Sequence, residues 1–231
     1  MFGLFRFDWT ILIVLPALIF SIWAQAKVSS TYKKHSAYPT RRGMSGADAA
    51  RQILDRNGLQ HVRIEHIRGE LTDHFDPREN VIRLSDAVHD SQSAAAIGVA
   101  AHEAGHAVQY ATGYAPIKFR AAIIPVTRFG SMAAIPLFFI GLLFYSDYLM
   151  LMGIILYATV ATFQLATLPV EFNASSRAMQ ALSASGELTE DEQHAARQVL
   201  TAAALTYVAA LVTSLLTLLR LVLLAGGNRR R

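Results

Sequence analysis

The stretch YLMLMGIILYATVATFQLATLPV, residues 148–170, carries no charged side chain and is long enough to cross a bilayer, which takes about 20 apolar residues. The whole chain of 231 residues is 53% hydrophobic and only 16% charged, with a mean hydropathy of +0.32. That balance is unusual for a soluble domain. We therefore expect a helical integral membrane protein. Buried helices of a soluble all-α protein are the weaker alternative.

Three further segments, at residues 9–26, 121–145 and 199–224, are apolar enough to span a membrane. Only Ser146 and Asp147 separate the segment at 121–145 from the one at 148–170, which predicts a tight helical hairpin. The segment at 9–26 ends in Ala24-Gln25-Ala26, a pattern that also occurs at signal-peptide cleavage sites. We favour an uncleaved anchor, because the positive charge of Arg6 is partly offset by Asp8.

Two polar stretches lie between these spans, at residues 27–120 and 171–198. An even number of crossings separates them, so both are expected on the same side of the membrane. Within the first, residues 45–58 read as a helix and residues 62–75 as a hairpin turning at Gly69-Glu70. Residues 76–80 read as a turn, residues 81–84 as a strand, and residues 93–110 as a helix.

That last helix contains AAHEAGHAVQY, residues 100–110. His102 and His106 are four apart, so on a helix they share a face and can grip one metal ion. Glu103 would project beside the ion, where it can take a proton from bound water. The chain has no cysteine, so any zinc must sit on nitrogen and oxygen ligands. A chance histidine pair in an alanine-rich helix is the alternative.

A catalytic zinc needs a third protein ligand, and the candidate is Glu171 in LPVEFNASSRA, directly after the third span. A carboxylate at an apolar boundary is costly without a partner, although it could simply face lipid headgroups. Ser175, four residues on, shares its helical face and could support the ligand. The rival ligands are His74, His89 and His194. Candidate donors to a transition state are His74, Tyr110 and Arg177.

Two long segments make the chain resemble the bacterial membrane-bound neutral zinc metallopeptidases often called YugP-like. They are GELTDHFDPRENVIRLSDAVHDSQSAAAIGVAAHEAGHAVQYATGY and LPVEFNASSRAM, and the resemblance covers roughly residues 45–179. It implies a gluzincin-type core with His102, His106 and Glu171 as zinc ligands and Glu103 as general base. Related gluzincins usually have an aspartate where this chain has Ser175. The resemblance also implies an edge strand on which an extended peptide substrate adds by backbone hydrogen bonds. Its residues would be Asn80, Val81, Ile82, Arg83 and Leu84.

The expected fold class is α+β: a helical integral membrane protein with about four transmembrane helices and a small gluzincin-type metallopeptidase core. The expected division is an N-terminal transmembrane anchor (1–26), a membrane-proximal metallopeptidase region (27–120), a transmembrane hairpin (121–170), a third-ligand helix and polar segment (171–198), and a C-terminal transmembrane helix with a basic tail (199–231). The expected function is a zinc metalloendopeptidase with one Zn²⁺ per chain that cleaves membrane-associated or unfolded polypeptides. A zinc-binding membrane scaffold without turnover is the alternative, and a small transporter ranks last.

The net charge of +4 and the pI near 9.5 suit a protein lying against anionic lipid. The basic residues are scattered, which argues against nucleic acid as a partner. Positive charges follow the first span and precede the second, which favours a cytoplasmic site in the bacterial inner (plasma) membrane, though only slightly. The opposite side would carry Arg6 and Arg229, Arg230 and Arg231. The sequence indicates no oligomeric state.

Overall fold

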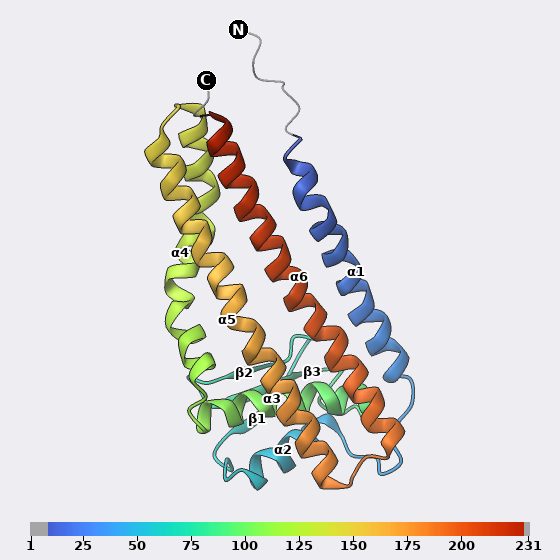
Figure 1. Cartoon of the computed structure of the whole chain (residues 1–231). Coiled ribbons are helices and arrows are strands. Elements are labelled where there is room, and N and C mark those ends of the chain that lie inside the picture. The colour runs from blue at the N-terminus through green and yellow to red at the C-terminus, as the bar shows by residue number, and fades with distance from the viewer. Residues whose placement is uncertain (1–8, 229–231) are drawn as a thin grey trace. The chain divides into compact units, whose positions relative to one another are not determined.

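The computed structural model describes residues 9–228, and it is an α+β protein with six helices and one small sheet in that range (Figure 1). The charged residues expected outside the spans, Arg6, Asp8 and Arg229 to Arg231, lie outside the described residues. The elements in chain order are α1 (Ile11–His35), α2 (Gly46–Arg56), β1 (Arg63–Ile67), β2 (His74–Asp76), β3 (Val81–Ser85), α3 (Ala94–Ala111), α4 (Ala115–Leu143), α5 (Asp147–Ser185) and α6 (Glu190–Asn228). The predicted fold class of helices plus a small sheet is confirmed.

The chain forms two compact units. Among the described residues, the helical unit comprises residues 9–23, 119–167 and 206–228, and the site unit comprises residues 24–118 and 168–205. Helices α1, α4, α5 and α6 are each long and apolar enough to cross a membrane, as expected for four spans. The structure continues α5 and α6 beyond the predicted spans, so residues 171–198 form the end of α5, a turn and the start of α6.

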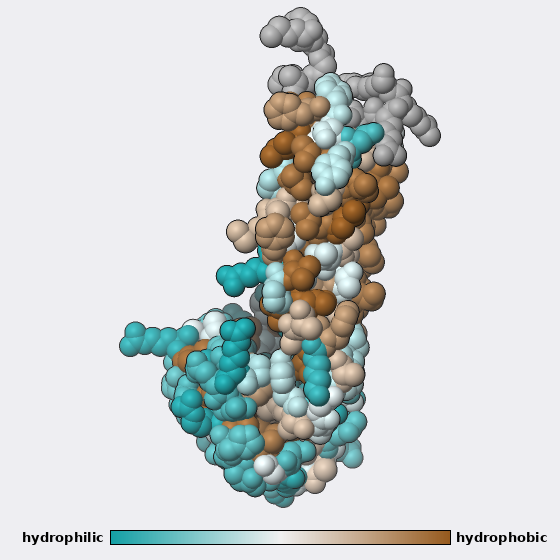
Figure 2. All heavy atoms as spheres, turned by 90° about the vertical axis from the view of Figure 1, so that its left-hand side faces the viewer, coloured by the Kyte–Doolittle hydropathy of each residue, from teal (hydrophilic) through white to brown (hydrophobic). Residues whose placement is uncertain are grey.

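Large apolar side chains are exposed mainly on the helical unit. Among the described residues, the strongly exposed ones lie in that unit apart from Tyr38, Leu71 and Phe172. Figure 2 shows hydrophobic side chains covering the helical unit on the face in view, and hydrophilic side chains covering most of the site unit. Exposed apolar surface of this extent suits lipid chains and not water. The composition and the structure therefore agree on a membrane protein.

The predicted hairpin of the second and third spans is confirmed by the close packing of α4 against α5. A Cβ atom added at Gly141 would lie 2.5 Å from the backbone nitrogen of Met150. One added at Gly153 would lie 2.8 Å from the carbonyl oxygen of Ala134. Small residues at such crossings let the backbones of membrane helices approach closely.

The sheet of the site unit has the strand order β1-β3-β2. Strand β3 pairs in parallel with β1, where Ile64 lies opposite Ile82, and antiparallel with β2, where Phe75 lies opposite the same residue. The prediction of residues 80–84 as an edge strand is therefore wrong, because β3 has a neighbour on each side. The predicted hairpin over residues 62–75 is also wrong, because β1 and β2 both pair with β3 and not with each other.

Two contacts between the β1–β2 connection and the end of β3 explain this order. The Gly69 N–H donates to Asp86 Oδ2 at 2.9 Å, and the Asp73 carboxylate accepts from the Ser85 N–H at 2.7 Å and from Ser85 Oγ at 3.0 Å. These contacts hold the connection across the end of β3, so β2 begins on the far side of that strand. The predicted turn over residues 76–80 is confirmed as the link between β2 and β3.

The helices predicted over residues 45–58 and 93–110 are confirmed as α2 and α3. Helix α2 starts at the N-cap Ser45, which forms a capping box with Asp48, and its chain leaves through Gly58 at φ +72°. Helix α3 starts at the N-cap Ser93. The core of the site unit is built from α2, β3, α3, the end of α5 and the start of α6. Helix α3 contributes more buried residues to it than any other element. The fully buried members of this core include Leu54, Ile82, Leu84, Ile97, Leu182 and Ala196.

Candidate metal centre

Helix α3 carries a stripe of small buried residues that lets α5 come close. Ala100, Ala101, Ala104 and Ala107 are almost completely buried. At Gly105 an added Cβ atom would lie 2.6 Å from the carbonyl oxygen of Ala174 in α5, so no larger residue fits there without movement. The two helices therefore meet at backbone contact between His102 and His106. This contact brings Glu171, one turn before Ala174, up to the two histidines.

The structure brings His102, His106 and Glu171 together. His102 Nε2 lies 3.2 Å from Glu171 Oε2, and His106 Nε2 lies 3.5 Å from the same oxygen. The two imidazole rings are nearly perpendicular, with centroids 4.7 Å apart. One potential ligand atom from each residue lies within 4.8 Å of the others. Glu171 is only 3% exposed, so its carboxylate is held away from water and needs a positive partner.

A chain of hydrogen bonds fixes which ring nitrogen of His106 faces Glu171. Arg177 Nε can only donate, and it does so to Asn173 Oδ1 at 2.8 Å. Gln109 Nε2 donates to the same oxygen at 3.0 Å and to the Val170 carbonyl at 2.8 Å. The Oε1 of Gln109 is thereby left as an acceptor, and it receives the Nδ1–H of His106 at 3.0 Å. The Nε2 of a neutral His106 then carries the lone pair.

Ser175 plays the corresponding part for His102. Its Oγ lies 3.1 Å from His102 Nδ1 and can accept a hydrogen bond from the Nδ1–H. The Nε2 lone pair of a neutral His102 is then available to bind a metal ion. The serine stands on the face of α5 that carries Glu171, as predicted, but the residue that it contacts is His102 and not Glu171. The hydroxyl thus supplies a hydrogen-bond acceptor to the ring of His102.

The sequence reasoning missed Gln109 and Asn173. Gln109 is fully buried, and its position three residues after His106 in an otherwise apolar stretch was the available signal. Asn173 lies two residues after Glu171 and so does not share its helical face. It reaches the centre only through Gln109, a contact between α3 and α5 that the linear sequence does not display.

The electrostatics of the centre favour a cation. Burial lowers the pKa of His106, but the hydrogen bond to Glu171 and the charges of Glu103 and Glu171 outweigh it, so this pKa lies above its usual value. Glu103, next to His102 on α3, is itself buried at 9% exposure. Two carboxylates beside two imidazoles leave an excess of negative charge that a divalent ion would neutralise.

The donor set fits zinc. Two imidazole nitrogens and one carboxylate oxygen are the ligands of many catalytic zinc sites, which keep a fourth position for water or substrate. Both histidines have the nitrogen opposite the centre engaged by a polar side chain, as metal-binding histidines almost always do. The arrangement therefore suits a catalytic metal better than a purely structural ion pair.

The other predicted site residues lie in different surroundings. His74 is exposed on β2 and its Nδ1 contacts the Thr72 carbonyl at 2.9 Å. Tyr110 packs edge-on against Phe75 of β2, with ring centroids 5.6 Å apart. Arg177 is held by Asn173 and lies over the ring of Tyr114. The rival ligands His89 and His194 contact Asp90 and Gln198 respectively, and within the described chain neither joins the His102–His106–Glu171 group.

The fold and the site define a class: an α+β membrane protein with a histidine, histidine and glutamate centre of the zinc peptidase kind. The chain belongs to the family described as "Putative neutral zinc metallopeptidase", whose model matches residues 10–226. It is 48% identical over 219 residues to the "Putative membrane protease YugP" of Bacillus subtilis (strain 168), an alignment that covers 95% of this chain and 97% of that protein. No solved structure matches the chain. The predicted family is therefore confirmed.

Proposed function

We propose that this membrane protein is a zinc endopeptidase in which His102, His106 and Glu171 hold one zinc ion and Glu103 is the general base. The observation that carries the proposal is the convergence of both Nε2 atoms on Glu171 Oε2, at 3.2 and 3.5 Å. The family and the relative, a "Putative membrane protease", support the same chemistry. The gluzincin type follows from the third ligand, a glutamate on a later helix.

When bound, zinc would supply a Lewis acid that polarises the scissile carbonyl and eases deprotonation of the attacking water. Glu103 would accept the proton of that water and return it to the leaving amine. The burial of Glu103 on α3 and the effect of its charge on the pKa of His106 support this role. Gln109 and Ser175 would hold the two imidazoles in the tautomer that binds metal.

The substrate chain would bind along β2, the outer strand next to α3. An extended peptide can add to a free strand edge through backbone hydrogen bonds. Within the described residues, the sheet order leaves β2 with one unpaired edge. The contact of Phe75 with Tyr110 ties this strand to the helix that carries the histidines. In this arrangement His74 and Tyr110 remain the candidate donors to the developing oxyanion. Arg177 would act as a positioning residue through Asn173 and Gln109.

The substrates would be membrane-associated or unfolded polypeptides, since only extended segments can pair with a strand edge. The basic residues that flank the spans support a site on the cytoplasmic side of the bacterial plasma membrane, by a small margin. A membrane scaffold that keeps the ion without turnover would not need a carboxylate beside the histidines, and Glu103 weighs against it.

Purified protein in detergent tests the proposal by cleavage of casein or of an unfolded peptide, with Glu103→Gln as the matched variant. The proposal expects cleavage by the wild type, none or almost none by Glu103→Gln, and the same zinc content in both. Equal cleavage by both proteins would show that Glu103 is not the base. Zinc in both with no cleavage of any polypeptide by either would favour the scaffold.

A further inference from the structure

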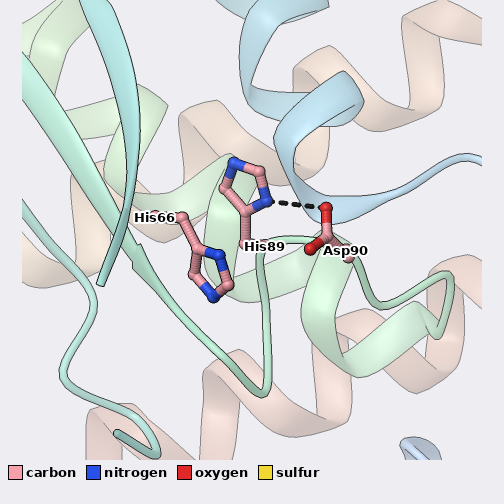
Figure 3. A group of neighbouring side chains, drawn as sticks. All are labelled: His66, His89 and Asp90. Carbon is pink, nitrogen blue, oxygen red and sulfur yellow. Dashed lines mark hydrogen bonds and ion pairs between the residues drawn. The ribbon is translucent and has the colours of Figure 1, made fainter. Parts of the chain in front are cut away.

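A second group of metal-binding side chains lies in the site unit, separate from the three residues of the proposed catalytic centre. It consists of His66, His89 and Asp90, drawn in Figure 3. One potential ligand atom from each residue lies within 4.8 Å of the others. Of the described residues, only this group and His102, His106 and Glu171 meet that criterion. None of the three has a part in the proposed peptide hydrolysis.

The parallel pairing of β1 with β3 creates the group. His66 of β1 lies opposite Leu84 of β3, so the carboxyl ends of the two parallel strands lie side by side. The chain then turns after Ser85, whose carbonyl accepts hydrogen bonds from the N–H groups of Val88 and His89, both at 2.9 Å. This turn places the imidazole of His89 against that of His66, with near-parallel rings whose centroids are 4.7 Å apart.

The loop that carries His89 and Asp90 is held rigidly by the start of α2. The Ala47 N–H donates to the His89 carbonyl, and the Gly46 N–H donates to the Ser91 carbonyl, each at 3.0 Å. The contact is so close that a Cβ atom added at Gly46 would overlap the Val88 carbonyl oxygen. A fixed backbone lowers the entropic cost of gathering ligands around an ion.

Carboxylates engage both imidazoles. Asp86 Oδ1 lies 2.8 Å from His66 Nε2, which leaves Nδ1 as the second ring nitrogen, and Asp90 Oδ1 lies 2.7 Å from His89 Nδ1 (Figure 3 shows the latter contact). A carboxylate on the opposite ring nitrogen is the usual support of a metal-binding histidine, and Asp86 is placed in this way for His66. Asp90 is placed differently, because its Oδ1 and the Nδ1 of His89 lie side by side and would bind the same ion. The lone pair of a ring nitrogen lies in the plane of its ring, and the two stacked rings are nearly parallel. One of the two rings must therefore rotate before both can bind the same ion. The side chain of His66 is 44% exposed and has the freedom to do so.

We propose that His66, His89 and Asp90 form a second divalent metal site, open to water and weaker than the catalytic centre. Imidazole and carboxylate ligands suit zinc and its neighbours in the transition series. Bound there, an ion would join β1 to the loop that leads into α3, and so would stabilise the fold without entering the catalytic reaction. The site is independent of the proposed function and would exist in an inactive variant.

The test is zinc binding to the full-length protein in detergent, carried out on Glu103→Gln so that no self-cleavage occurs. Equilibrium dialysis against added zinc is expected to give about two ions per chain for Glu103→Gln and about one when His66→Ala or His89→Ala is added. The control is His61→Ala, which removes another exposed histidine of the same region and should leave two ions. Asp90→Asn preserves shape and should weaken the second zinc by about 10-fold or more.

A thermal melt with increasing zinc supplies a second readout, because an ion that binds only the folded state raises Tm. After the catalytic site is saturated, Tm should rise further in Glu103→Gln and in the His61→Ala control, but not in the His66→Ala variant. One zinc per chain in all these proteins, with no further rise in Tm, would overturn the proposal. Two ions in the His66→Ala, His89→Ala and Asp90→Asn variants alike would overturn it as well, because the second ion would then lie elsewhere.

Discussion

His106 Nδ1 lies 3.0 Å from Gln109 Oε1, three residues further along α3, and this contact fixes the face that the imidazole turns toward Glu171. Gln109 is oriented in turn by the Val170 carbonyl and by Asn173. The direction of each hydrogen bond in the series from Arg177 to His106 follows from Arg177, whose guanidinium can only donate. The orientation of one proposed zinc ligand, His106, is thus set by Arg177, which lies about two helical turns along α5 from Glu171.

Replacement of Gln109 by leucine is expected to weaken zinc binding by about 10- to 100-fold, because His106 loses the acceptor that fixes its tautomer. Gln109→Glu keeps an acceptor at that position and should bind zinc more tightly than Gln109→Leu. Competition with a chelator of known affinity measures the difference. Gln180→Leu, on an exposed position of α5, is the control. An unchanged zinc affinity in Gln109→Leu would show that Gln109 does not support zinc binding.

Ser175→Ala is expected to weaken zinc binding by roughly 10-fold through loss of the contact between its hydroxyl and His102 Nδ1. The matched control is Ser176→Ala, the neighbouring and exposed serine. The same chelator competition applies to both variants. If the two variants bind zinc equally well, the hydroxyl of Ser175 contributes nothing to the site.

Gly105→Ala is expected to destabilise the protein by about 1–3 kcal/mol and to lower zinc affinity, since its Cβ would meet the Ala174 carbonyl and push α5 away from α3. Thermal melting and zinc content measure the two effects. Gly226→Ala adds the same methyl group where no atom of the described chain lies within 4 Å, and serves as the control. A Gly105→Ala protein as stable and as zinc-rich as the wild type would contradict the close crossing of α3 with α5.

The raised pKa of His106 predicts how the metal-free protein responds to pH. A group whose pKa is higher in the folded state stabilises that state fully below its unfolded pKa of about 6.5, and this contribution is lost as pH rises through the folded value. The metal-free protein should therefore lose stability above about pH 6.5. Zinc competes with protons for the same ligands, so zinc-loaded protein should show the opposite trend.

The measurement is Tm in chelator and in zinc from about pH 6 to about pH 8, across which the gap between the two curves should widen. Glu171→Gln is the control, since it removes the carboxylate that contacts His106 Nε2. This variant should show little change in the gap with pH. A wild-type gap that stays constant or narrows as pH rises would contradict the assignment.

Much of the fold could be predicted because its signals are local. The apolar runs, the capping serines Ser45 and Ser93, and Gly58 each specify their own helix or its end. The sheet order could not be predicted in this way. The alternation in residues 62–75 is typical of strands but does not say which strand lies between the others. Contacts such as that of Asp73 with Ser85 decide the order, and they join residues that no local pattern relates.

The residues of the candidate site likewise fall into those that local sequence patterns predict and those that depend on the packing of distant segments. The spacing of His102 and His106 requires only a helix, and Glu171 was found because an unpaired carboxylate at an apolar boundary demands a partner. Gln109 and Asn173 escaped because their importance depends on how α3 crosses α5. That crossing depends on Gly105, whose role is steric and carries no chemical signature in the sequence.

In the proposed centre, one zinc ion is held jointly by α3 and by Glu171 of α5. The most direct measurement is the zinc that remains per chain after dialysis against zinc-free buffer, in the wild type, in Glu171→Gln and in Glu103→Gln. We predict about one tightly held zinc in the wild type and in Glu103→Gln, and almost none in Glu171→Gln, which loses one of three ligands. Equal zinc in folded wild type and Glu171→Gln, or no zinc in folded wild type, would show that Glu171 is not a zinc ligand.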